Sequence, residues 1–331
     1  MGQFVRAAMT RGVAKRRPKH AREQREQREL RIDTLVDLAT ACEAGLLSPP
    51  GGGGGAALAC AVHALDGFIG AKRVKLLARD MALLSCLGLA DEDDFTNVMV
   101  TGNPGTGKTE LIGLVAEILR ALYHGKRSRV TWLTRAHLVG QHLGETALKT
   151  ARALASAAPG VVVLDEVYAL GSGDGRDSFA KECVDTLNQF MSECSSEISV
   201  VVAGYKNETE HCFLQQNPGL ARRFPHRFHI DDYTPDELCA IAARQLERAG
   251  WRAYDGWSSS AIVRKAVAIS RFNGGDTARL LVLCKLAHAR RIPPEAERRS
   301  LTEADVAAGC AEFARTADRD SEVEPPLQMY T

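Results

Sequence analysis

The 331-residue sequence predicts an α/β fold with a parallel sheet, followed by an all-helical domain. Short apolar runs rich in β-forming residues alternate with stretches of helical spacing, a pattern typical of strands covered by helices on both faces of a sheet. After Thr234 the β-rich runs stop, and four stretches of helical spacing follow. The sequence therefore predicts a sheet domain with a smaller helical domain behind it.

An N-terminal arm is predicted before the sheet. The residues up to Arg31 include ten basic and three acidic side chains. Residues 32–47 have helical spacing, and Pro49, Pro50 and the five glycines at 51–55 then indicate a flexible break. We therefore expect residues 1–55 to form a basic, partly disordered arm with one helix and a glycine-rich linker.

The overall composition argues against a membrane protein. The chain carries 42 Lys and Arg against 41 Asp and Glu, so its net charge favours neither nucleic acid nor an anionic membrane surface. No apolar run reaches the roughly 18 residues that a spanning helix needs. Nine cysteines without a C-x-x-C pair indicate a reducing, intracellular compartment. The cytoplasm is the simplest reading, and the run Lys15–Lys19 leaves nuclear import open beside a solvated tail.

Residues 56–233 are expected to form the α/β domain. Helical spacing over 58–65 and 74–89 comes first, with the turn Leu65–Gly70 between the two stretches. The β-rich runs then follow at 97–101, 130–133, 161–164, 198–203 and 228–230. These runs are the predicted strands of the sheet.

A phosphate-binding loop follows the first of these runs. Gly102-Asn103-Pro104-Gly105-Thr106-Gly107-Lys108-Thr109 matches G-x-x-x-x-G-K-[ST] in full, directly before a helical stretch at 110–122. In that setting main-chain N–H groups and the helix N-terminus bind phosphate oxygens. Lys108 is expected to reach the β- and γ-phosphates of ATP, and Thr109 to bind Mg²⁺ through its hydroxyl. The alternative is that an ordinary glycine-rich turn matches the motif by chance.

Two acids end the third run, Asp165 and Glu166. A buried parallel strand ends at the edge of the sheet where ligands bind in such folds. Asp165 is therefore expected to hold the Mg²⁺ shell, partly through water, and Glu166 to orient the attacking water. Taken alone, the pair would fit an acidic turn after a strand better, and the phosphate-binding loop is what favours the functional role.

These motifs together resemble one branch of a known family. Gly102–Thr109, Val161–Tyr168, Val201–Lys206 and Asn217–Arg223 are similar to the CbbX/SpoVK branch of AAA+ ATPases, which includes red-type Rubisco activases, over about residues 58–315. The resemblance implies a five-stranded P-loop NTPase core with a helical lid, Mg-dependent hydrolysis of ATP, and a homo-oligomeric ring, expected to be a hexamer, that remodels a protein substrate.

The resemblance also assigns roles to individual residues. Phe68, Ile69 and Gly70 correspond to the segment that lines the adenine pocket, and Glu110 is placed with the nucleotide-binding residues. Arg223 corresponds to an arginine that reaches the ATP site of the neighbouring subunit. Arg222 is the near alternative for that role. The other alternative is that these arginines belong to a solvated basic loop without such a role.

Two positions depart from the family pattern. Asp276 stands where the family has a lid arginine that senses the γ-phosphate, and Arg279 is the candidate replacement, with a helix-surface residue as the alternative. Gly204-Tyr205 stands where many AAA+ members have a polar Thr-Asn pair on the sensor strand, although the CbbX/SpoVK branch itself resembles Gly-Tyr.

The residues themselves also predict the helical lid. Thr234-Pro235-Asp236-Glu237 is a capping box with proline at the first helical position. Helical stretches are expected near 238–249, 259–271, 277–291 and 302–315. Residues 234–316 are therefore the predicted lid, and 317–331 a flexible tail.

The substrate class depends on the segment Leu138–Gly144, which is similar to the family's central pore loop. His142, Leu143 and Gly144 take the places of an aromatic residue, an aliphatic residue and glycine. This favours an extended protein substrate, although an ordinary loop with an exposed histidine is the alternative. Two other functions stay open: a helicase-loader type ATPase whose basic arm contacts nucleic acid, and a scaffold that binds ATP without turnover.

Overall fold

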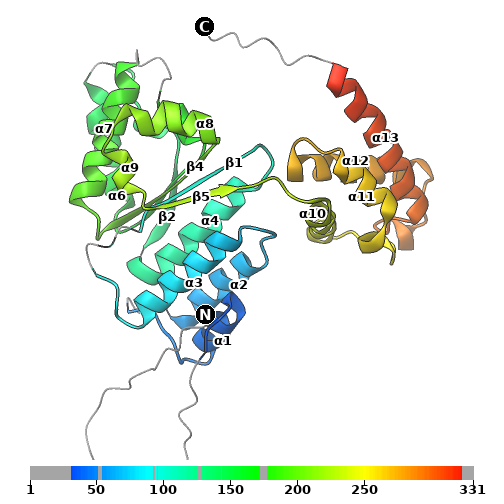
Figure 1. The fold of residues 1–331 in the computed structure, drawn as a ribbon, viewed down its shortest axis with the longest axis horizontal. Coiled ribbons are helices and arrows are strands. Elements are labelled where there is room, and N and C mark those ends of the chain that lie inside the picture. The colour runs from blue at the N-terminus through cyan, green and yellow to red at the C-terminus, as the bar shows by residue number, and fades with distance from the viewer. Residues whose placement is uncertain are drawn as a thin grey trace, which may run out of the picture.

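The computed structural model describes residues 31–50, 54–91, 94, 96–125, 128–142, 144–171 and 177–322. An α/β domain and a helical domain lie side by side in it and are joined after the last strand (Figure 1). The run Lys15–Lys19, Leu143 and residues 323–331 lie outside the described residues. Within the described part, no helix is both long and apolar enough to cross a membrane. All nine cysteines lie in this part and are free.

Five parallel strands form the sheet of the described α/β domain, in the order β2-β3-β4-β1-β5. The strands are β1 Val98–Gly102, β2 Arg129–Leu133, β3 Gly160–Leu164, β4 Ile198–Gly204 and β5 His226–Ile230. Val201 of β4 pairs with Val98 of β1 on one side and with Val163 of β3 on the other. The loops that follow β1, β3 and β4 therefore meet at one edge of the sheet, and the expected parallel sheet is confirmed.

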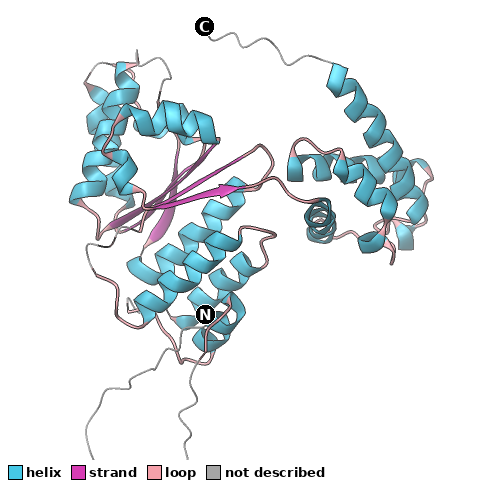
Figure 2. Cartoon of the chain, in the orientation of Figure 1, coloured by secondary structure: helices cyan, strands magenta, loops and turns pink. Residues whose placement is uncertain are grey.

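Alternation along the strands divides the core between the two faces of the sheet. Val98, Val100 and Val163 belong to one hydrophobic cluster, whereas Met99 and Val162 belong to the other. The first face is covered by α1 Leu35–Glu43, α2 Gly55–Asp66, α3 Lys72–Cys86 and α4 Lys108–Leu119, and the second by α5 Arg135–Leu138, α6 Glu145–Ala157, α7 Ser178–Glu193 and α9 Leu220–Arg223, with α8 Lys206–Glu208 after β4. Figure 2 shows both layers of helices around the strands.

Helix α1 differs from the expectation that it belongs to a separate arm. Leu35, Leu38 and Cys42 are buried in the same cluster as α2, α3 and α4. A side chain at Gly55, the first residue of α2, would approach the carbonyl oxygen of Cys42 to 2.5 Å, so the two helices meet closely at this glycine. The boundary expected at residue 55 therefore does not separate α1 from the core, because its apolar face is buried there.

The helical lid is built on its own core. Its helices are α10 Pro235–Arg248, α11 Ala261–Ala268, α12 Asn273–Arg290 and α13 Glu303–Glu322. Thr234 and Glu237 form the predicted capping box, with the Thr234 main-chain N–H donating to Glu237 Oε2 over 2.9 Å. Leu246, Leu280 and Phe313 come from three of these helices and are almost fully buried together. Helix α12 begins at Asn273, four residues before the expected start.

Candidate functional site

The glycine-rich loop joins the end of β1 to the start of α4, as the motif predicts. Gly105 adopts a left-handed φ of 74°, which disfavours any residue with a side chain. Lys108 turns back into the loop, where its Nζ donates to the carbonyl oxygens of Gly102 at 2.9 Å and Asn103 at 2.8 Å. Burial lowers the pKa of the Lys108 ammonium, while the nearby carboxylates of Asp165 and Glu166 oppose that shift. The loop thus holds a partly desolvated positive charge at its centre.

The two acids that follow β3 lie beside this loop. Asp165 Oδ2 accepts a hydrogen bond from the Thr109 hydroxyl, and Asp165 Oδ1 accepts one from the Glu166 main chain at 2.9 Å. Glu166 is exposed and has a φ of 51°, an uncommon conformation for a residue with a side chain. The structure therefore brings together Lys108, Thr109, Asp165 and Glu166 from the ends of two strands separated by β4.

A pair of tyrosines closes the same edge of the sheet. Tyr205, directly after β4, stacks on Tyr168 with ring centroids 5.4 Å apart. The Nζ of Lys108 lies 4.5 Å from the centre of the Tyr205 ring, within range of a cation–π interaction. Burial and the Glu166 carboxylate raise the pKa of Tyr168 to about 12. The sequence singled out Tyr205 as a departure, but its contact with the lysine was missed because it depends on how the two strand ends meet.

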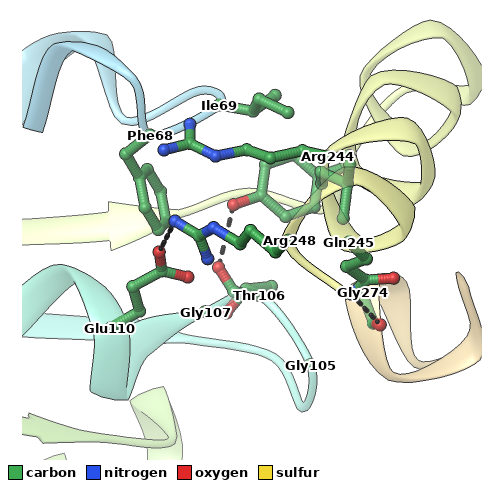
Figure 3. A pocket seen from close by; sticks show the side chains of 12 residues that line it. Phe68, Ile69, Gly105, Thr106, Gly107, Glu110, Arg244, Gln245, Arg248 and Gly274 are labelled. Atoms are coloured by element: carbon green, nitrogen blue, oxygen red, sulfur yellow. Dashed lines mark hydrogen bonds and ion pairs between the residues drawn. The ribbon is translucent and has the colours of Figure 1, made fainter. Parts of the chain in front are cut away.

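A pocket of about 160 Å³ lies between the loop, the turn after α2 and the lid (Figure 3). Its walls include the predicted residues Phe68, Ile69, Gly105, Thr106, Gly107 and Glu110. Gly70 is absent from the walls but leaves room for Tyr233, whose ring a side chain at Gly70 would approach to 3.0 Å. The Tyr233 hydroxyl donates to the carbonyl of Thr106 at 2.9 Å.

The lid contacts the loop through main-chain and side-chain groups of α12. The main-chain N–H of Gly274 donates to the Gly105 carbonyl at 2.9 Å. Asn273 Nδ2 donates to Asp232 Oδ1 at 2.8 Å, and Asn103 Nδ2 contacts both oxygens of the same carboxylate at 3.0 Å. These hydrogen bonds lower the pKa of Asp232. The first turn of α12 is therefore fixed against the phosphate-binding loop.

The lid position where the family has an arginine has a structural role in this chain. Asp276 Oδ2 accepts hydrogen bonds from the main-chain N–H groups of Arg271 at 2.8 Å and Phe272 at 2.9 Å, so the carboxylate caps the turn before α12. These bonds also explain the early start of α12. Arg279 is exposed on the lid, with its guanidinium 5.9 Å from the ring of Phe313, and the pocket walls do not include Arg279.

Two other arginines do reach the pocket from the lid. Arg244 and Arg248 of α10 line it, and Arg248 Nη2 forms an ion pair with Glu110 Oε1 at 2.7 Å (Figure 3). The sequence analysis missed both, because arginines four residues apart on a helix are common surface residues. Their spacing places them on one face of α10, which was the only signal available.

Arg223 stands at the far end of the sheet from the loop. It ends α9, and its carbonyl accepts a hydrogen bond from Asn97 Nδ2 at 2.9 Å. Asn97 precedes β1 whereas the loop follows it, and a strand of this length spans about 16 Å. Arg222 is exposed and Arg223 is half-buried. Neither of these arginines lines the pocket of its own chain.

The segment compared with a pore loop connects α5 to α6. The short helix α5 intervenes after β2, so the segment is a connection between two helices. His142 is exposed, and its main-chain N–H and that of Gln141 both donate to Glu145 Oε2 at 3.3 Å. Gly144 precedes α6 directly. The histidine thus lies on a surface loop that the first turn of α6 supports.

Comparisons with known proteins agree with this geometry. The model of the ATPase family associated with various cellular activities (AAA) matches residues 98–232. The chain is 37% identical to Protein CbbX of Cereibacter sphaeroides over 54% of its length, and spans 60% of that protein. It is 36% identical to the chloroplastic ribulose bisphosphate carboxylase/oxygenase activase of Cyanidioschyzon merolae, again over 54% of its length, and spans 63% of that protein. The chain thus covers less than two thirds of either relative.

A third relative and one solved structure match a larger share of this chain. The chain is 32% identical to the chromosomal Protein CbxX of Cupriavidus necator, over 69% of its own length and 75% of that protein. The crystal structure of the FIGL-1 AAA domain in complex with ADP has a similar fold, with a TM-score of 0.53 at 17% identity over 76% of this chain and 83% of that one. The chain therefore belongs to the AAA+ ATPases, in the branch that contains the CbbX proteins.

Proposed function

We propose that this chain binds ATP with Mg²⁺, hydrolyses it, and uses the turnover to remodel a protein partner as part of a ring. The observation that carries the proposal is the meeting of Lys108 and Thr109 with Asp165 and Glu166 at one edge of the sheet. A phosphate-binding loop with an acid pair beside it is the arrangement that phosphoryl transfer requires.

The residues present fit a magnesium ion. The Thr109 hydroxyl and the Asp165 carboxylate are in direct hydrogen-bond contact, so two oxygen ligands already converge. Mg²⁺ in nucleotide sites commonly takes one or two protein oxygens and fills its other positions with phosphate and water. Bound there, the ion would neutralise charge on the phosphate oxygens. Asp165 and Thr109 are the residues that would hold it.

Glu166 is the proposed base for the attacking water. Its carboxylate is exposed at the strand end, one residue beyond the Asp165 side chain that contacts Thr109. The left-handed backbone at Glu166 is an unusual conformation of the kind found at functional sites. Lys108, already partly desolvated, would bind the phosphates of ATP and stabilise the charge that spreads over them.

Assembly into a ring is proposed from the position of Arg223. Arg223 lies near the start of β1, at the other end of the strands from the phosphate-binding loop of its own chain. Its main chain is held there by the hydrogen bond from Asn97. A guanidinium in that place suits the ATP site of a neighbouring subunit, because its planar fork matches phosphate oxygens. We expect a homo-hexamer, as the family implies, in which each pocket is completed by the next subunit.

The proposed substrate is a polypeptide. The exposed His142, on the loop between α5 and α6, is the candidate contact with an extended chain. The activase relative from Cyanidioschyzon merolae is named for an action on a protein, which supports this substrate class.

Steady-state ATP hydrolysis across a protein concentration series tests the enzyme and its assembly. We expect the specific activity to rise with concentration, Glu166→Gln to bind ATP without turnover, and Arg223→Ala to lose turnover. Arg222→Ala is run beside Arg223→Ala, because Arg222 is an exposed arginine of the same helix and the alternative candidate for this role; turnover lost in Arg222→Ala alone would assign the role to Arg222. Activity that is independent of concentration, with both arginine variants turning over at the parent rate, would reject the shared site.

The substrate class is tested by stimulation of the ATPase. Unfolded casein should raise the ATP turnover of the parent chain. It should raise the turnover of His142→Ala less, and that of His142→Tyr as much as in the parent, because tyrosine restores a flat ring. Stimulation by single-stranded DNA with steep salt dependence, and none by casein, would instead favour a nucleic-acid partner.

A further inference from the structure

The lid presents positive charge to the pocket from an unexpected helix. Of the described residues that line the pocket, Arg244 and Arg248 carry the positive charge, and both belong to α10 (Figure 3). Residues four apart lie on the same helix face, so Arg244 and Arg248 extend from one side of α10, Arg244 to the turn after α2 and Arg248 to the start of α4. Arg248 is therefore the cation that lies over the first residues of α4, where the loop ends.

Helix α12 contributes main chain and no charge at the same place. Its residue in the pocket wall is Gly274, and Asp276 is 8% exposed because its carboxylate caps the preceding turn. Arg279 is exposed on the lid, with its guanidinium over the ring of Phe313. The side of the pocket that α12 covers is therefore lined by a glycine, and α10 supplies the cations.

The two arginines have different surroundings. Arg244 lies against the main chain of the turn after α2, since a side chain at Gly67 would approach its Nη2 to 2.8 Å. Arg248 reaches Glu110 at 2.7 Å, and the two side chains are 53% and 43% exposed. An ion pair this exposed contributes little to stability, typically 1 kcal/mol or less, so a stronger anion can displace its carboxylate. Arg248 can therefore change its anionic partner more readily than Arg244.

We propose that Arg248 is the lid residue that binds the phosphate chain of the nucleotide, and that Glu110 holds this arginine when the pocket contains no nucleotide. The proposal rests on the proposed nucleotide-binding function. Arginine forms two parallel hydrogen bonds with phosphate as well as with carboxylate, so the exchange preserves its geometry. The negative charge of Glu110 then opposes nucleotide binding, both by holding Arg248 and by repelling the phosphates.

Two substitutions in the same ion pair should change affinity in opposite directions. Arg248→Gln is expected to weaken ADP binding about 10-fold, the effect of losing one charge-assisted hydrogen-bonded contact. Glu110→Gln is expected to tighten it about two- to five-fold, because it releases the arginine from a weak pair. Arg248→Lys keeps the charge and should recover part of the loss. A pair that served only to fix the lid would weaken binding in both variants.

The measurement is the affinity of the full chain for a fluorescent ADP, with unlabelled ADP and adenosine as competitors. Arg264→Gln is the matched control, since Arg264 pairs with Asp236 on the lid surface away from the pocket walls. We expect adenosine affinity to be the same in Arg248→Gln and the parent. Equal losses for ADP and adenosine, or weakening by Glu110→Gln, would overturn the inference. A parent chain that binds no ADP would instead reject the proposed function itself.

Discussion

Replacing Gly105 by alanine tests how closely the lid sits on the phosphate-binding loop. Two costs add at this position. The left-handed backbone, with φ at 74°, costs about 1 kcal/mol for a residue with a side chain. The new Cβ would also lie 1.9 Å from the carbonyl oxygen of Phe272, which belongs to the main chain and cannot rotate away.

The second cost can be isolated with a matched glycine. Gly144 has a φ of 82° and nothing within 4 Å of the position a Cβ would take, so Gly144→Ala should lose only about 1 kcal/mol. Gly105→Ala must also move the lid and break the hydrogen bond from Gly274, which adds roughly 2 kcal/mol. We therefore expect about 3 kcal/mol for Gly105→Ala.

Hydrogen–deuterium exchange without nucleotide reports the contact between loop and lid, and urea unfolding reports the total loss of stability. The peptide that contains Gly274 should exchange faster in Gly105→Ala and at the parent rate in Gly144→Ala. The urea midpoint should fall further in the first variant than in the second. Equal midpoints and equal protection at Gly274 would refute the close contact between loop and lid.

Three further predictions concern other parts of the molecule. Asp276→Ala should cost about 2 kcal/mol in thermal unfolding, because two main-chain N–H groups lose their acceptor, and a loss as large in Asp276→Asn would contradict this. Burial lowers the pKa of His124 from 6.5 to about 4, so the unfolded chain takes up the proton first. The free energy of unfolding, measured by urea denaturation, should therefore fall as the pH is lowered from 6.5 to 4, by up to about 1.4 kcal/mol per pH unit, and His124→Asn should flatten that slope. Tyr205→Leu should lower kcat/KM for ATP about two- to thirty-fold through the lost cation–π contact with Lys108, whereas Tyr205→Phe should keep it.

The parts of the fold that the sequence predicted are those encoded locally. Valine-rich runs such as 161–164 become buried strands because β-branched side chains suit a sheet covered on both faces. Thr234 caps α10 through a hydrogen-bond pattern that spans four residues. The loop and the acid pair could be expected to meet because both follow strands of a parallel sheet, and the structure places the ends of these strands, β1 and β3, on either side of β4.

The parts that the sequence did not predict depend on contacts between distant segments. Glycines at 51–55 indicate a break in secondary structure, yet they do not reveal that Leu38 is buried with the helices beyond them. Arg248 reads as a surface residue until the lid is placed over Glu110. Asp276 could be recognised as a departure from the family, but its role as a cap required the position of the turn before α12.

The bond between the Gly274 N–H and the Gly105 carbonyl joins two main-chain groups. Every residue except proline carries the same donor, and every residue carries the same acceptor. Substitutions that leave the backbone path unchanged therefore cannot delete this link, however much the side chains around it diverge. A displacement of the loop reaches the lid through the peptide units themselves, so the connection between the two domains is protected against most single mutations.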